Sequence, residues 1–379
     1  MKLFQRLLVA PAALGLLAPM TANASEVNLN DISNYSDEGL EISSDSFSDY
    51  STENPLLIAG GEGLHDDHGA EGFSSTTSAS FSVDFAIGAV DGSSDTEAVV
   101  AGYGFQMDLN TSFTGEDSLD ISLDAGNAGA SLGELDLNSG GGTLTVDGVA
   151  YTFPVGDSIT AFVGDSTDGS LLFNTACVYG GQTNVLDDCG NGSSALAIAT
   201  GTSFGASIDL DQGWAAAFGY ESTDTTNGLM TKEQLDAYGV QVSYSADSYG
   251  ASVTYGMHET SATAETTYWG FNGYWTPDST GSIPSISVGY EIGDPSTSGA
   301  ADTEQFFVGL QWDEVGPGTL GAALGTVGAI DEGATEYYQY EAFYSYPVND
   351  GMTITPVIYV KETSGEDETG VLVKTSFSF

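Results

Sequence analysis

The sequence predicts an all-β fold, a transmembrane antiparallel β-barrel of about 16 strands, with 14 as the alternative count. Three observations predict it. The chain ends in an alternating strand that closes on an aromatic residue, the same alternation runs back through about 300 residues, and an export signal stands at the other end. Together these features are typical of barrels that cross a membrane with strands.

The C-terminal strand covers residues 369–379, TGVLVKTSFSF. Val371, Val373, Phe377 and Phe379 share one parity, and a lysine and serines occupy the other. Successive residues of a strand face opposite sides, so this strand has one apolar and one polar face. A final outward phenylalanine is the usual ending of a bacterial outer-membrane barrel, which marks Phe379 as the signal for the barrel-assembly machinery.

The N-terminus has the pattern of a secretory signal peptide. Lys2 and Arg6 give a positive start, residues 7–20 form an apolar core, and Ala22-Asn23-Ala24 is a small-x-small cleavage site. The core is too short to span a bilayer as a helix. We therefore expect residues 1–24 to be removed and the mature chain to lie beyond the inner membrane.

Residues 25–72 have a different composition from the rest, with 12 acidic residues and no lysine or arginine. Such a segment is expected to be flexible. Within it His65, Asp66 and His68 are suitable metal ligands. The alternative is a solvated polar stretch, because nothing in a flexible segment preorganises them. Residues 73–379 form the predicted barrel domain.

Alternating segments define the predicted strands, and aromatics such as Trp214 and Tyr220 bracket their apolar parts. Tight turns such as residues 277–283 alternate with longer polar segments such as residues 259–266. Barrels place short turns on the periplasmic side and long loops outside, whereas a soluble sandwich has no reason to sort connections by end. The 16 strands are centred near residues 82, 105, 121, 149, 161, 206, 217, 241, 253, 272, 288, 309, 324, 342, 357 and 374.

Composition fits a barrel and sets its charge. Fifty glycines, 19 tyrosines and 18 phenylalanines indicate turns and aromatic packing, and mean hydropathy is −0.04. Fifty-four acidic residues face five basic ones, two of which fall in the signal peptide. This excludes nucleic acid as a partner and predicts that cations accumulate near the protein. The alternative explanation of the acidity is a salt-adapted surface.

The longest predicted connection, about 166–200, is the third loop. It contains Cys177 and Cys189, a lone pair that in an exported protein predicts a disulfide. Asp168, Asp187 and Asp188 lie in the same loop. They either contribute to a constriction or, in the alternative, belong to an external loop with solvated carboxylates.

Strand parity places further charged residues on the inner face, and acids prevail among them. Rings of carboxylates select cations, so we expect cation preference. Lys361 and Lys374 are the basic residues on this face. No catalytic constellation and no cofactor motif stands out. The acidic residues are Asp84, Asp108, Asp120, Asp124, Asp209, Glu221, Glu291, Asp313 and Glu341.

Several segments together resemble cyanobacterial outer-membrane porins of the OprB-type carbohydrate-selective or iron uptake group. They are residues 1–24, GGEGL at 60–64, FSSTTSASF at 73–81, YTFPVGDSITAFVG at 151–164 and the cysteine loop. The resemblance implies a homotrimeric barrel in the outer membrane that passes small hydrophilic solutes and inorganic ions. Members usually carry a surface-layer-homology domain before the barrel, where this chain has the acidic segment.

Two other classes compete with this interpretation. A soluble, salt-adapted secreted β-rich surface protein or adhesin would bury its apolar residues at mid-strand and would not sort its loops by length. A barrel enzyme would need a catalytic set, which the sequence does not offer.

Overall fold

The computed structural model describes residues 76–92, 98–135, 137–138, 140–190, 201–222, 228–231, 235–278 and 282–379. All of them belong to one unit of the chain, Glu71–Phe379. The predicted signal peptide (1–24), the acidic segment (25–72) and the candidate metal ligands His65, Asp66 and His68 lie outside the described residues. Those expectations stay predictions.

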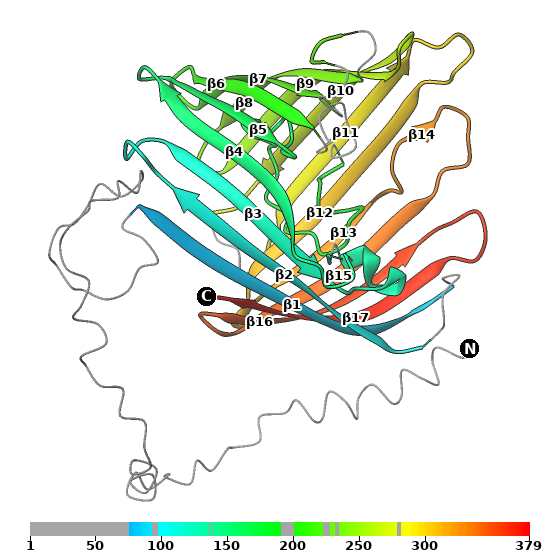
Figure 1. Cartoon of the computed structure of the whole chain (residues 1–379). Helices are drawn as coiled ribbons and strands as arrows, with labels where there is room; N and C mark the ends of the chain where they lie inside the picture. The colour runs from blue at the N-terminus through cyan, green and yellow to red at the C-terminus, as the bar shows by residue number, and fades with distance from the viewer. Residues whose placement is uncertain are drawn as a thin grey trace, which may run out of the picture. The chain divides into compact units, whose positions relative to one another are not determined.

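The described chain is a β-barrel of 16 long strands, with one two-residue strand in a loop (Figure 1). Every predicted strand centre falls inside an observed strand, so the count of 16 is confirmed and the count of 14 is wrong. The strands are β1 (Thr77–Asp91), β2 (Val100–Thr111), β3 (Ser118–Gly126), β4 (Thr145–Val155), β5 (Ile159–Asp165), β6 (Thr202–Asp209), β7 (Trp214–Ser222), β8 (Asp236–Ser245), β9 (Tyr249–Ser261), β10 (Ala264–Trp275), β11 (Ser285–Pro295), β12 (Thr303–Val315), β13 (Gly318–Thr326), β14 (Ile330–Asp331), β15 (Tyr338–Asn349), β16 (Met352–Lys361) and β17 (Glu368–Ser378).

The barrel closes where β1 pairs with β17. Each long strand pairs antiparallel with its neighbours in the sequence, and β1 pairs on its other side with β17. The main chains of Phe81 and Phe379 exchange two hydrogen bonds of 2.9 and 3.0 Å, which extends the ladder to the last residue. Figure 1 shows the C-terminus beside β1. Closure gives every long strand a partner on both sides, so no edge is left to pair elsewhere.

The outer face of the sheet is apolar, and the inner face is mostly polar, with apolar side chains such as Val357 where the inward loops cover it. In β8, Val240 and Val242 are 50% and 48% exposed, whereas Gln241 and Ser243, which alternate with them, are buried. In β16, Ile358 is 52% exposed beside the buried Val357. Among the described residues, no helix is long and apolar enough to cross a membrane. A continuous exposed apolar face of this kind requires an apolar environment.

Aromatic rings gather where the short turns lie. Trp214 follows one turn, and Tyr244 and Tyr249 flank the next, with ring centroids 5.0 Å (Trp214–Tyr244) and 5.8 Å (Tyr244–Tyr249) apart. Belts of amphipathic rings at the limits of the apolar band are typical of membrane barrels. The predicted bracketing of apolar strand segments by aromatics is therefore present at this end.

Connection lengths sort by end of the barrel, with two departures from the prediction. Residues 259–266, predicted as a long polar segment, continue β9 and β10 into a tight hairpin. The segment is rich in threonine, which favours strands, so the ladder runs on past the apolar band. The tight turn predicted at residues 277–283 is instead a connection of nine residues, 276–284, between β10 and β11.

Replacing Phe379 with alanine is expected to weaken closure of the barrel. Its ring stacks on Phe81 with centroids 5.6 Å apart, and such pairs contribute about 0.5–1.5 kcal/mol beyond the area they bury. The folded barrel of Phe379→Ala should convert to the unfolded, slower-migrating form at a lower temperature on a gel. Phe379→Tyr keeps the ring and is the matched control. Equal transition temperatures for the alanine and tyrosine variants would contradict the role of the stack.

Candidate functional site

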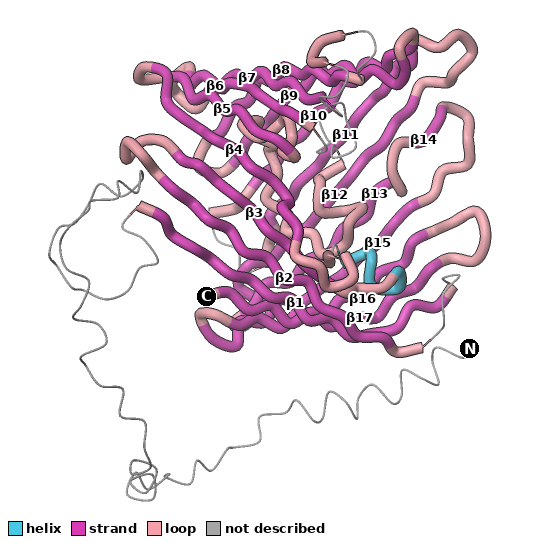
Figure 2. The backbone as a smooth tube through the Cα atoms, in the orientation of Figure 1, coloured by secondary structure: helices cyan, strands magenta, loops and turns pink. Residues whose placement is uncertain are grey.

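The third loop enters the barrel and runs across its inner wall over its described residues 166–190. Its described part, residues 166–190, lies between the strands in Figure 2, among the loop segments drawn inside the barrel. Every second backbone N–H of residues 174–182 donates to an inward side chain. The pairs are Asn174 to Gln241 Oε1 (2.6 Å), Ala176 to Ser252 Oγ (3.3 Å), Val178 to Ser287 Oγ (3.0 Å), Gly180 to Gln311 Oε1 (2.9 Å) and Gln182 to Glu341 Oε1 (3.2 Å).

These acceptors belong to β8, β9, β11, β12 and β15, so the loop crosses the wall from one side of the barrel toward the other. Buried N–H groups must be paired, and here side chains of the wall provide the partners that a neighbouring strand would otherwise provide. The alternative of an external third loop is therefore excluded for residues 169–190. Four of these acceptors are serines and glutamines, which are common at lumen parity and carry no distinguishing pattern, whereas Glu341 was predicted as an inner-face acid.

Glycines of the wall make room for the loop. A Cβ atom on Gly219 would overlap the carbonyl oxygen of Gly169, and a Cβ atom on Gly289 would overlap the carbonyl oxygen of Cys189. Close approach of two backbones is a common reason for glycine in a strand. The wall is thus shaped for the loop at both ends of its inward course.

A disulfide joins Cys177 to Cys189, with the two Cα atoms 6.4 Å apart. It closes the loop segment that contains Tyr179 and Leu186, both of which are buried. The carbonyl oxygen of Cys189 also accepts a hydrogen bond of 2.9 Å from Asn272 Nδ2 of β10. The disulfide therefore joins two parts of the loop that are each fixed separately to the wall.

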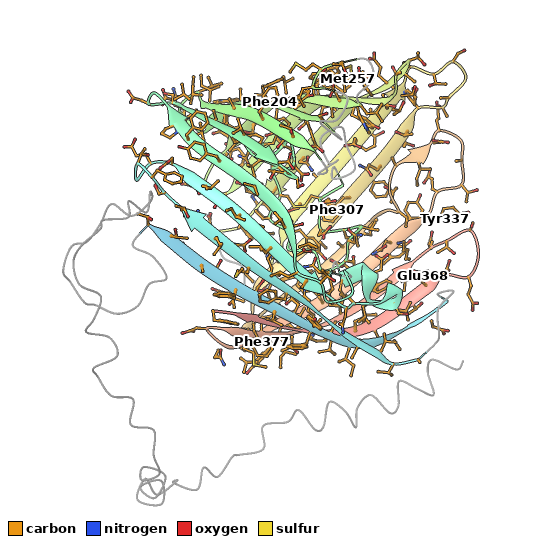
Figure 3. All side chains as sticks on the ribbon, in the orientation of Figure 1. Phe204, Met257, Phe307, Tyr337, Glu368 and Phe377 are labelled. Carbon is orange, nitrogen blue, oxygen red and sulfur yellow. A yellow bond between two sulfur atoms is a disulfide. The ribbon has the colours of Figure 1, made fainter. Side chains whose placement is uncertain are left out.

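Aromatic packing holds the middle of the loop. The ring of Tyr179 lies 5.4 Å from that of Phe307 and 5.9 Å from that of Phe343. Figure 3 shows Phe307 among the side chains enclosed by the strands. Burial raises the pKa of the Tyr179 hydroxyl, and the negative charge of Glu341 raises it further, so this hydroxyl stays protonated and donates to Glu341 at 2.6 Å.

The described residues of loop 2, the connection 127–144, also lie inside the barrel, although no sequence pattern predicted an inward course for it. It contains a short 3-10 helix, η3 (Ala130–Leu135), drawn in cyan in Figure 2. Leu132, Leu135 and Leu137 are buried against the wall. Three leucines within six residues of an otherwise polar loop were the available signal. Glu134 of this helix forms an ion pair with Lys361, the one ion pair within the described part of the chain.

Three of the predicted pore carboxylates are buried, two of them in contact with loop 3, and do not line an open passage. Glu221, Glu291 and Glu341 are 0%, 2% and 4% exposed. Parity placed them on the inner face, but parity does not reveal what covers that face. Their hydrogen bonds join loop to wall or strand to strand. The donors are Gly169 N to Glu221 (2.9 Å), Gln305 Nε2 to Glu291 (2.9 Å), and Tyr179 Oη and Thr183 Oγ1 to Glu341 (2.6 Å each).

Asp108, Asp120 and Asp124 lie on the inner face of β2 and β3 and keep partial exposure. Pairing of the two strands sets Asp124 opposite Gln106, Asp108 opposite Ser122 and Asp120 opposite Asn110. The three carboxylates therefore fall on successive rows, about 7 Å apart along the strand. Hydroxyl and amide groups donate to them and leave further lone pairs available. The shortest of these bonds are Ser122 Oγ to Asp108 (2.7 Å), Asn110 Nδ2 to Asp120 (2.6 Å) and Thr145 Oγ1 to Asp124 (2.6 Å).

The remaining predicted residues lie at several levels of the barrel. Asp84 and Lys374 are half-buried on the inner faces of β1 and β17, and Asp209 and Asp313 are exposed near the short turns. Asp187 is half-buried and Asp188 is exposed in loop 3. Partial burial raises the pKa of Asp168, and the charges of Asp188 and Asp147 raise it further, so these acids lie near one another.

Comparison with solved structures gives the same fold in several outer-membrane proteins. Pseudomonas putida OprB superposes with a TM-score of 0.60 at 11% identity, covering 80% of this chain and 94% of that one. A loop-deletion mutant of Vibrio cholerae OmpT gives 0.56 at 11%, over 80% and 99%. A mutant of Rh. blastica porin gives 0.53 at 15%, over 80% and 100%. No protein-family model and no curated protein matches the chain.

Replacing Gly289 with alanine is expected to displace loop 3 and destabilise the barrel. The new methyl group would meet the carbonyl of Cys189, and overpacking of this kind costs about 1–3 kcal/mol. Gly273 on the outer face of β10 has no neighbour closer than 3.5 Å to an added Cβ, so Gly273→Ala is the matched control. Heat-induced unfolding should shift for Gly289→Ala alone. A shift of the same size in both variants would contradict the fit between loop and wall.

The disulfide predicts that neither cysteine reacts with a thiol reagent in the folded or the unfolded chain. Alkylation under denaturing conditions without a reductant, followed by intact-mass analysis, should add no label. After reduction the same treatment should add two labels. Labelling of both cysteines before reduction would show that the covalent link between the two parts of loop 3 is not formed in the protein.

Proposed function

We propose that the protein is a bacterial outer-membrane porin that passes small hydrophilic solutes and inorganic ions by diffusion and prefers cations. The observation that carries this proposal is the contrast between the two faces of a closed 16-strand barrel. The outer face exposes apolar side chains, and the inner face carries polar groups and carboxylates. Barrels of this strand number enclose an aqueous channel.

The two inward loops support a narrowed passage. Loop 3 covers the wall from β7 to β15, and loop 2 covers parts of β1, β2, β16 and β17. The carboxylates of β2 and β3 lie on a part of the inner wall whose side chains are partly exposed. A solute entering the barrel would therefore pass between loop 3 and the carboxylate-bearing wall.

Charge on that wall supports cation preference. Lys361 is paired with Glu134, which leaves Lys374 as the other lysine of the described inner face. Two unit charges 4 Å apart interact by roughly 4 kcal/mol at an effective dielectric of about 20. Even after strong screening, three successive carboxylates would therefore repel an anion enough to bias permeation severalfold.

We further propose a homotrimer with lipid contact around the barrel, insertion by the barrel-assembly machinery through Phe379, and a solute related to carbohydrate or iron. The resemblance to cyanobacterial porins supports these assignments. We propose no enzymatic activity and no cofactor. The competing function, a soluble secreted β-rich surface protein or adhesin, is disfavoured because a soluble protein would not leave the outer apolar face in water.

The reversal potential of single channels under a KCl gradient tests the cation preference. We expect a reversal potential of the sign that K⁺ permeation gives. The bias toward cations should be smaller at higher salt because the Debye length falls from about 8 Å at 0.15 M to about 3 Å at 1 M. The triple variant Asp108→Asn, Asp120→Asn, Asp124→Asn should reduce the bias. A second variant, Asp187→Asn with Asp188→Asn, measures how much of the cation preference comes from loop 3.

The matched control for the triple variant is Glu265→Gln, Glu332→Gln, Glu366→Gln, which removes three exposed acids near the long loops. It should leave the bias nearly unchanged. Absence of stepwise conductance from folded protein would contradict the porin proposal. Anion preference, or a bias insensitive to the triple variant, would contradict the role of the β2 and β3 carboxylates.

A further inference from the structure

Glu134 of loop 2 contacts three different parts of the barrel interior. Its Oε1 atom forms the ion pair with Lys361 Nζ at the end of β16. Its Oε2 atom accepts a hydrogen bond of 3.1 Å from Gln339 Nε2 of β15. Its backbone oxygen accepts a hydrogen bond of 2.9 Å from the backbone N–H of Asn184, which belongs to loop 3. One residue therefore joins loop 2 to two strands and to the other inward loop.

The apolar neighbours of Glu134 strengthen this junction. Leu132 and Leu135, on either side of it, are 0% and 2% exposed. They belong to the same buried cluster as Tyr179 and Leu186 of loop 3. The two loops thus share one apolar core inside the barrel, and a displacement of either loop would expose part of the core of the other.

We infer that Glu134 is a positioning residue that couples loop 2 to loop 3, so that the two loops narrow the barrel as one unit. The inference rests on the proposed function where it concerns the width of the passage. The ion pair is largely shielded from water, with side-chain exposures of 23% for Lys361 and 14% for Glu134. Removing one partner leaves the other charge partly buried and unpaired, which is costly.

Hydrogen–deuterium exchange of the folded full-length barrel tests the coupling directly. Glu134→Ala in loop 2 should speed amide exchange in the loop 3 peptide that contains Asn184 by about tenfold, because the opening of loop 3 no longer has to displace a fixed loop 2. The matched control Glu366→Ala removes an exposed glutamate from the 362–367 loop and should leave that peptide unchanged. If the alanine variant does not fold, Glu134→Gln keeps the side-chain length and removes the charge.

A charge swap separates a specific pairing from general loosening. Lys361→Met should accelerate exchange in the same peptide, and adding it to Glu134→Ala should have little further effect. Glu134→Lys combined with Lys361→Glu should restore slow exchange. Lys374 is the other lysine of the inner wall. Lys374→Met should leave amide exchange at loop 3 unchanged, both in the wild type and in Glu134→Ala. Additive effects of Glu134→Ala and Lys361→Met, or no rescue by the swap, would overturn the inference.

Single-channel recording then links the coupling to the passage. The wild type should give one dominant conductance level, and Glu134→Ala should add further levels as the loops move separately. Unchanged exchange at loop 3 in Glu134→Ala, with normal conductance steps in the wild type, would overturn the inference and leave the porin proposal intact. Coupled exchange without conductance in the wild type would refute the porin proposal and leave the coupling of the loops established.

Discussion

The pairing of backbone polar groups is the constraint on which the rest of this structure depends. A sheet whose outer face is apolar cannot leave N–H and C=O groups unpaired in an apolar environment, where each such group costs several kcal/mol. Closing β1 on β17 satisfies this constraint around the whole ring, down to the two hydrogen bonds between Phe81 and Phe379. An apolar outer face therefore requires closure, and closure separates that face from the inner one.

The same constraint reappears inside the barrel in another form. Loop 3 has no strand beside it, so its buried N–H groups use side chains of the wall as acceptors at every second residue. Glycines such as Gly289 then let the loop backbone come close enough for those bonds to form. The inner wall is therefore specialised by region, because the part under loop 3 holds the loop while β2 and β3 keep carboxylates partly exposed.

The strands were predictable from the sequence because their signal is local. Alternation with a period of two appears within any stretch of about eight residues, and it located all 16 long strands and the inward parity of Asp108, Glu341 and the other acids. The hairpin at 259–266 departs from the predicted loop because its polar segment contains threonines that continue the ladder beyond the apolar band.

The inner course of the loops was not predictable in the same way. The partners of Asn174 and Val178 in the wall are Gln241 and Ser287, 67 and 109 residues away. Nothing local distinguishes these side chains from other polar residues of the inner face. For the same reason Glu221, Glu291 and Glu341 could be assigned to the inner face but not to its covered part, and the partner of Lys361 in loop 2 was not foreseen.

Burial of some carboxylates and exposure of others changes how the large negative charge of the chain can act. Glu341 is occupied by hydrogen bonds from Tyr179 and Thr183, and Glu134 is occupied by Lys361, so these acids hold the loops in place. In the proposed porin, the acids that could meet a solute are those with partial exposure, such as Asp108 and Asp120 of β2 and β3. A chain with so few lysines cannot oppose them with a basic cluster. The electric field inside the barrel therefore depends on how far each carboxylate is covered, and the inward loops contribute to that cover.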